Sequence, residues 1–218
     1  MSNSTDRLTY YAGAGFLDDN GIVNNSGMKR YNGRLNAEYQ ARPWMKVTTN
    51  MNFTHTDSDS PSYTTLNWAS SGNMFYIANN IAPIYPLYVR NADGTIKMDG
   101  DRIVYDSNQT NFKRAGVVGN AIRDNEFNHD KSYRDVMTGV WGVAFTPVEG
   151  LSLSANLGVT SNVSRNNYLG SVFADGSSVD GYAQATSGRM FTVNNQYLAE
   201  YKTNFGETKH NFDIMAGY

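Results

Sequence analysis

The chain has 218 residues, a net charge of −2 and no cysteine, and only 17% of its residues are charged. The absence of a basic block argues against a nucleic-acid partner, and the lack of cysteine excludes a disulfide scaffold, a thiolate metal site and a cysteine nucleophile. No run of 18 apolar residues occurs, so no transmembrane helix is predicted. The many Tyr, Phe, Gly, Asn, Ser and Thr residues favour strands and turns, and therefore an all-β fold.

Alternation of apolar and polar residues predicts seven strands. In chain order they are 8–17, 31–40, 45–54, 133–146, 151–160, 190–201 and 210–218. The alternation is cleanest in the second, third and fifth segments. There it places Leu35, Val47, Met51, Leu153 and Leu157 on one face, and Arg34, Asn36, Asn50 and Asn156 on the other. Asn195 interrupts the apolar face of the sixth segment, and Val136 and Val140 blur the alternation in the fourth.

The connections between these segments alternate in length. Tight turns are expected at 41–44 and 147–150, whereas 18–30, 55–132 and 161–189 are long, and 202–209 is shorter. Short turns on one rim and long loops on the other are typical of an outer-membrane β-barrel. Seven strands are too few to close such a barrel, the start of the chain lacks the apolar core of a signal peptide, and alternation still runs at Tyr218. We therefore expect an internal fragment, about seven strands of a larger barrel.

A soluble β-sandwich that binds glycans is the alternative interpretation, because one face of a sandwich sheet also alternates. Two features favour the barrel. The alternation persists for about ten residues, the length that crosses a tilted bilayer. Aromatic residues also gather beside the tight turns, as in an interfacial girdle, namely Tyr39, Trp44, Phe145, Tyr197 and Tyr201. In a barrel the opposite, polar face lines the lumen, and the residues expected there are Arg34, Asn36, Glu38, Lys46, Asn50 and Asn156.

An ordered set of short segments resembles the SusC/RagA-type TonB-linked outer-membrane transporters. The segments are YY (10–11), GFLDDNG (15–21), KRYNGRLN (29–36), WMKV (44–47), IAPIYP (81–86), NNQYLAEY (194–201) and HNFDIMAGY (210–218). None is diagnostic alone, but together they follow the order of the family over nearly the whole chain.

The resemblance implies a part, residues 1–218, of a TonB-dependent receptor barrel of about 22 strands in the bacterial outer membrane. Signal peptide, plug, TonB box and terminal strands are not found in the sequence. Such transporters import large nutrients, oligosaccharides or sometimes peptides. They work with a SusD-like surface lipoprotein and draw energy from the TonB complex. The resemblance implies no cofactor and no enzymatic activity.

The remaining motifs are weak. His55, His129 and His210 are scattered and match neither a metal site nor a Ser/His/Asp arrangement, so they are expected at solvated positions. Asp57-Ser58-Asp59 and Asp99-Gly100-Asp101 lack the EF-hand spacing and are expected in turns, the second within a hairpin from about residue 91 to 105. An aromatic group in the long connection is a candidate for contact with a glycan ligand or a partner, or else packs the loop itself. It comprises Trp68, Phe75, Tyr76, Tyr85 and Tyr88.

Overall fold

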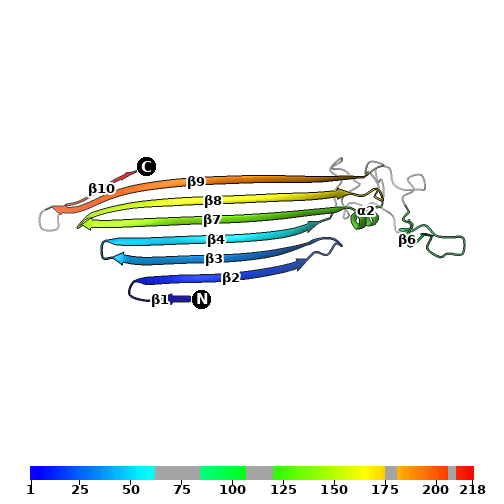
Figure 1. Ribbon diagram of the computed structural model, residues 1–218, viewed down its shortest axis with the longest axis horizontal. Helices are drawn as coiled ribbons and strands as arrows, with labels where there is room; N and C mark the ends of the chain where they lie inside the picture. The colour runs from blue at the N-terminus through cyan, green and yellow to red at the C-terminus, as the bar shows by residue number, and fades with distance from the viewer. Residues whose placement is uncertain (62–83, 107–119, 175–180, 206–209) are drawn as a thin grey trace.

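The computed structural model shows one open, single-layered antiparallel sheet of eight strands (Figure 1). It describes residues 1–61, 84–106, 120–174, 181–205 and 210–218. The strand order is β1-β2-β3-β4-β7-β8-β9-β10, so neighbours in the sequence are neighbours in the sheet apart from the insertion between β4 and β7. Within the described residues, no large side chain is fully buried. The sheet therefore has no dry core on either face.

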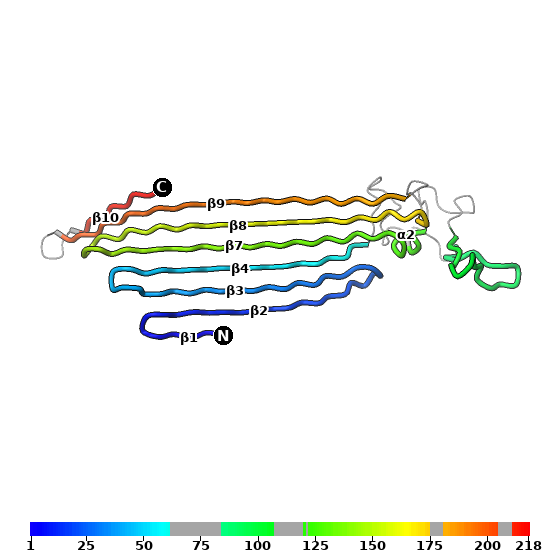
Figure 2. Tube along the Cα trace, in the orientation of Figure 1, coloured from blue at the N-terminus to red at the C-terminus, as the bar shows by residue number. Residues whose placement is uncertain are grey.

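The elements are as follows. The sheet comprises β1 (Ser2–Ser4), β2 (Leu8–Asn20), β3 (Gly27–Arg42), β4 (Met45–Ser60), β7 (His129–Val148), β8 (Leu151–Gly170), β9 (Tyr182–Phe205) and β10 (His210–Gly217). The insertion carries β5 (Met98–Asp99), β6 (Arg102–Ile103) and the helix α2 (Ala121–Phe127). Figure 2 shows that α2 and the β5–β6 hairpin lie at one end of the sheet. The tight turns after β3 and β7 lie at the other.

All seven predicted strands are present, as β2, β3, β4, β7, β8, β9 and β10. The short β1 pairs with β2 and adds an eighth strand to the roughly seven that the alternation predicted. The predicted bounds of the long loop 161–189 are wrong, because β8 continues to Gly170 and β9 begins at Tyr182. Strand ladders need only backbone hydrogen bonds, so these strands continue after the apolar alternation has ended.

The register collects the apolar side chains of all long strands on one face, named here the apolar face. Because side chains alternate between faces, residues directly opposite one another across the strands share a face. One such row is Ala12, Leu35, Met51, Gly139, Val159 and Val193. The adjacent row on the other face, the polar face, is Tyr11, Asn36, Asn50, Val140, Gly158 and Asn194. Val136 and Val140, which blur the alternation, lie on the polar face, and Asn195 lies on the apolar one.

The strand ends are staggered from one hairpin to the next. A reference row runs through Leu8, Tyr39, Val47, Val143, Ala155 and Tyr197. β2 begins on this row, β4 begins at Met45 beyond it, β8 begins at Leu151 further beyond, and β9 ends at Phe205. Figure 1 shows the same stepwise displacement of the turns. A progressive stagger in one direction is what the tilted strands of a barrel wall require.

Candidate functional site

The apolar face carries an uncovered hydrophobic band. On β4 the band runs from Met45 to Phe53, close to the roughly 9–11 residues with which a tilted strand crosses a bilayer. Leu35 and Leu157 are each 40% exposed and Leu153 is 38% exposed. These side chains thus remain well exposed, whereas the dry core of a folded protein would bury them. The band is therefore uncovered within the described residues, and burying it would require an apolar solvent or partner.

Aromatic side chains border this band at both ends. Near the tight turns, the rings of Trp44 and Phe145 stack with their centroids 6.2 Å apart. At the other end, Phe16 packs against Tyr31 at 4.9 Å. The sequence pointed to the first border but not to the second, because Phe16 and Tyr31 lie near the two ends of the predicted loop 18–30 and not beside a predicted tight turn. Two aromatic borders match the girdles of a membrane-spanning wall.

One row of side chains in the middle of the band includes two polar residues and the large indole ring of a tryptophan. Thr49, Trp141, Leu157 and Asn195 lie side by side across four strands. The hydroxyl oxygen of Thr49 is buried and has no hydrogen-bond partner within the described part of the chain. The Trp141 ring lies over Gly139, where any Cβ would collide with it. Glycine at this position therefore makes room for the indole.

The polar face carries all six residues that the sequence assigned to a barrel lumen. Arg34, Asn36, Glu38, Lys46, Asn50 and Asn156 occupy neighbouring positions of β3, β4 and β8. A hollow of ≈ 830 Å³ opens on this face between β1 and β7, lined in part by Asn36, Glu38 and Asn50. The Oδ1 atom of Asn36 is buried there and accepts no hydrogen bond from the described residues. The wall thus offers amide groups that are not all satisfied internally.

Charged side chains lie toward both ends of the polar face, and those near the tight turns form ion pairs. Lys46 Nζ lies 2.5 Å from Glu38 Oε1. Lys202 Nζ lies 2.6 Å from Glu200 Oε1 and 3.7 Å from Asp213 Oδ2. These side chains are largely exposed, so each pair contributes little to stability. The remainder of this face is dominated by uncharged amides and hydroxyls.

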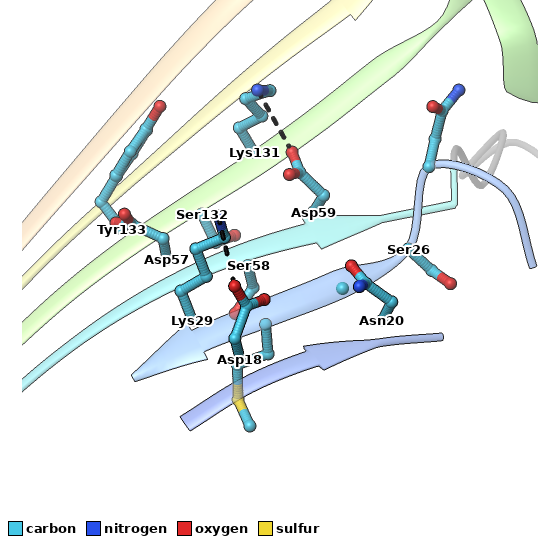
Figure 3. Close-up of a pocket in the computed structure, with 13 residues that line it drawn as sticks. Asp18, Asn20, Ser26, Lys29, Asp57, Ser58, Asp59, Lys131, Ser132 and Tyr133 are labelled. Atoms are coloured by element: carbon cyan, nitrogen blue, oxygen red, sulfur yellow. Dashed lines mark ion pairs between the residues drawn. The ribbon is translucent and has the colours of Figure 1, made fainter. Parts of the chain in front are cut away.

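Beyond the aromatic border, the apolar face becomes charged. Figure 3 shows a hollow of ≈ 310 Å³ there, formed by β2, β3, β4 and β7. Lys29 Nζ lies 3.5 Å from Asp18 Oδ2, and Lys131 Nζ lies 3.5 Å from Asp59 Oδ1. The sequence analysis missed this cluster, and it was wrong to place Asp57-Ser58-Asp59 in a turn, since all three belong to β4. The signal available in the sequence was the alternation of the charged residues Asp57 and Asp59 with the uncharged residues Thr56, Ser58 and Ser60.

His55 stands at the boundary between the band and this charged region. Its Nδ1 lies 2.6 Å from Asp135 Oδ1 on β7, and its Nε2 lies 3.0 Å from Asp57 Oδ1 on β4. The Tyr31 ring on β3 lies 6.0 Å away. The hydrogen bond with Asp135 and the charges of both carboxylates raise the pKa of His55 above its usual value, against a smaller opposing effect of desolvation. His55 is thus a strand residue held between two carboxylates.

The insertion after β4 packs into a small aromatic unit. The rings of Tyr88, Tyr105, Phe127 and Phe173 follow one another at centroid distances of 5.2, 6.1 and 5.7 Å. The guanidinium of Arg102 lies 4.1 Å from the Phe173 ring centroid. Tyr105 donates its hydroxyl hydrogen bond to Glu126, and burial together with this carboxylate raises the pKa of Tyr105. This unit joins the insertion to the end of β8.

Asparagines fix the same unit to the sheet, and Asn120 and Asn128 among them are buried. Asn120 caps α2 by accepting a hydrogen bond from the Arg123 N–H and donates to the carbonyl of Leu87 at 2.9 Å. Asn25 donates to the carbonyl of Asn125 at 2.6 Å, and Asn128 accepts from the Ser171 N–H at 2.8 Å. The β2–β3 connection is therefore held against α2.

The aromatic ligand candidates fall into two groups. Tyr88 packs on Tyr105 within the aromatic unit, and Tyr85 is half-buried nearby in the chain. Trp68, Phe75 and Tyr76 lie outside the described residues. A role of these five in ligand or partner contact stays a prediction.

The described side chains form no cluster of three or more metal ligands. The turn expected at Asp99-Gly100-Asp101 is confirmed, because β5 and β6 pair across it and Gly100 has a φ of 61°. His129 is exposed at the first position of β7, and His210 is the first residue of β10. No helix within the described ranges is both long and apolar enough to cross a membrane.

Solved structures share this fold over almost the whole chain. Two structures of the RagAB peptide importer, in its closed-closed and open-open states, match 99% of the chain with TM-scores of 0.70 and 0.66 at 21% and 19% identity. A structure described as the RagAB peptide transporter matches 99% of the chain with a TM-score of 0.71 at 20% identity. No family profile and no curated protein matches the chain.

The chain spans less than a quarter of the chains it matches, 23%, 23% and 22% of their lengths. The matches agree with the open meander, since the sheet corresponds to one part of a much larger chain. At this identity the comparison concerns the fold. The resemblance to SusC/RagA-type transporters that the sequence predicted is therefore confirmed at the level of the fold.

Proposed function

We propose that the chain is a segment of the barrel wall of a SusC/RagA-type outer-membrane transporter, with residues 1–218 belonging to the barrel domain. One observation carries this proposal: the apolar face presents an uncovered hydrophobic band of bilayer height, bordered by aromatic side chains, and backed by a polar face. Lipid acyl chains solvate the apolar side chains, and the backbone N–H and C=O groups are hydrogen-bonded between neighbouring strands. The polar face, with Arg34, Asn36, Glu38, Lys46, Asn50 and Asn156, then borders the lumen.

The alternative, a β-sandwich in water, requires a second layer over the apolar side chains. The part of the chain that the structure describes supplies no such layer, and the exposed apolar face far exceeds the patches that soluble monomers carry. The stagger of the hairpins also supports the barrel, since it has a single direction over the whole sheet. We propose no catalytic step.

The cargo and partners follow from the same proposal. The matched structures are described as a peptide importer and transporter. For this chain we propose uptake of large polar nutrients, oligosaccharides or peptides, together with a SusD-like surface lipoprotein and the TonB complex. The amide-rich polar face supports such cargo, because amides donate and accept hydrogen bonds with hydroxyls and peptide groups alike.

Site-directed labelling tests the membrane assignment without a background signal, since the chain has no cysteine. Single cysteines replace Leu35, Met51 or Leu157 on the apolar face, and Asn36, Asn50 or Asn156 on the polar face. Each variant is made in the outer membrane and labelled with an environment-sensitive fluorophore. We expect lipids that carry a nitroxide on the acyl chain to quench strongly the fluorophores attached on the apolar face.

The adjacent positions are matched controls, because they differ by one residue in the sequence and by the face on which they lie. The polar-face set should instead be quenched by a water-soluble quencher. Equal quenching of both sets by lipid nitroxides, or shielding of Leu35, Met51 and Leu157 from both quenchers, contradicts the barrel and supports a packed soluble sheet.

A further inference from the structure

The charged part of the apolar face lies at a defined height above the hydrophobic band. Lys29 precedes the aromatic Tyr31 by two positions along β3, and Asp57 lies four positions beyond Phe53 on β4. With a rise of about 3.3 Å per residue and a tilt of about 40°, these side chains lie roughly 5–10 Å beyond the band. In the proposed membrane orientation, Lys29 lies among the lipid headgroups, which occupy about 5–8 Å on each side of the hydrocarbon, and Asp57 lies at their outer edge.

The charges at the aromatic border and beyond it form a mixed pattern of both signs on the apolar face, named here the charge checkerboard. Within the described residues, its members are Asp18, Asp57, Asp59 and Asp135, with Lys29, Lys131, Arg165 and Arg189. Four carboxylates thus face four permanent cations, and His55 stands between two of the carboxylates. A patch for anionic lipids would show an excess of basic residues instead.

The ion pairs within the checkerboard are loose enough to accept a further partner. Lys29–Asp18 and Lys131–Asp59 are both 3.5 Å apart, whereas close charge-assisted hydrogen bonds measure about 2.7–2.9 Å. Each of these four side chains is about half exposed. All four line the hollow of ≈ 310 Å³ in Figure 3, on the side that faces away from the lumen in the proposed barrel.

We propose that this hollow binds the headgroup of a membrane lipid that carries both a phosphate and a primary ammonium, such as a phosphoethanolamine group. Lys29 and Lys131 contact the phosphate, and the ammonium lies among Asp18, Asp57 and Asp59. Neighbouring strands of a sheet lie about 4.8 Å apart, a spacing that suits a headgroup whose two charges are joined by a short linker. The hollow offers both signs of charge to a zwitterion, whereas an anionic headgroup would meet its three carboxylates as well as its two lysines.

This inference rests on the proposed function, because only a membrane-spanning wall brings headgroups to this surface. The test therefore uses the protein isolated from membranes and placed in nanodiscs that contain equal parts of phosphatidylethanolamine, phosphatidylglycerol and phosphatidylcholine. Native mass spectrometry measures which lipids remain bound. The fluorophore at Leu157→Cys, quenched by acyl-chain nitroxides, reports in the same sample whether the band is in the bilayer.

We expect phosphatidylethanolamine to be retained about twofold to fivefold over each of the other lipids, the factor that one exposed ion pair corresponds to. The double variant Lys29→Ala/Lys131→Ala should lose this enrichment. The matched control Arg30→Ala/Arg134→Ala should keep it, since Arg30 and Arg134 lie at the same height on the polar face.

Several results overturn the assignment. Equal retention of the three lipids would show that the hollow does not select a headgroup. A preference for phosphatidylglycerol would show that the surface binds anionic lipids instead. Binding of soluble phosphoethanolamine in detergent, without enrichment of the lipid in nanodiscs, shows that the ligand is not a lipid. If the Leu157→Cys fluorophore is not quenched, the proposed function fails, and this outcome is distinct from the other three.

Discussion

The two ends of the apolar face differ in chemistry although they share the same strands. Along β4, Met45 to Phe53 contribute apolar side chains to this face, and the next three positions on it are His55, Asp57 and Asp59. The backbone pairing is continuous through the change, because β4 and β7 remain in register from Met45 to Ser60. The difference shows that the ladder sets the shape of the wall, and the side chains set what surrounds it at each height.

This comparison predicts that the two ends of the apolar face respond differently to an introduced charge. In the band, a charge must leave water, whereas in the charge checkerboard it joins an already solvated set. The predictions below test this difference and the local packing that supports it, in order of decreasing expected effect.

The first variant is Leu157→Arg, in the middle of the band on β8. We expect a loss of about 2–4 kcal/mol in the free energy of unfolding, the cost of an arginine at the bilayer midplane of a barrel. The adjacent Asn156→Arg on the polar face is the control and should change stability much less. Denaturant unfolding in lipid vesicles measures both. Equal losses for the two variants are incompatible with a lipid-facing band.

The second variant, Gly150→Ala, addresses the tight turn between β7 and β8. Gly150 has a φ of 83°, and a Cβ there would collide with the carbonyl oxygen of Lys202, whose N–H donates to the Gly150 carbonyl at 2.8 Å. Strain and collision together should lower the free energy of unfolding by ~2 kcal/mol. Gly94→Ala separates the two causes, because Gly94 has a φ of 85° but open space around it. A loss as large for Gly94→Ala would assign the effect to backbone strain alone.

The third variant, Gly139→Ala, tests the indole packing inside the band. The added methyl group would displace the Trp141 ring, which is free to move, so we expect a loss of ~1 kcal/mol and a changed tryptophan emission. Gly33→Ala, on the same face with no atom nearby, is the matched control. Unchanged emission in Gly139→Ala would show that the ring does not rest on Gly139 in the membrane.

The smallest expected effect concerns His55 and pH. Because its pKa is raised in the folded state, the protonated ring stabilises the fold fully below the ordinary pKa of 6.5, and this contribution is lost as pH rises through the folded-state pKa. The denaturant concentration at the midpoint of unfolding should therefore decrease as the pH is raised from about 5.5 to about 8.5. In this range histidine is the principal titrating side chain. His55→Gln should remove that part of the pH dependence. An identical pH profile in the variant would exclude His55 as its source.

The candidate site was only partly predictable from the sequence. The lumen assignment of Asn36 and Asn50 needed only their position within an alternating segment. Asp135, by contrast, meets His55 across two strands separated by the long insertion, so their proximity depends on the β4–β7 register. The aromatic unit around Tyr105 likewise joins residues whose spacing in the chain has no period.

The sequence by itself determined which side chains share a face, because successive residues of a strand point to opposite sides and the apolar set repeats every second position. It also located the tight turns, where Gly150 and the segment at 41–44 interrupt this repeat. Only the tertiary structure decided how far the strands extend and how they are staggered. Backbone hydrogen bonds extend β8 and β9 well past the apolar residues. The register between strands is a property of pairs of strands. It sets the tilt of the wall, and it brings Lys29, Asp57 and Lys131 into one hollow.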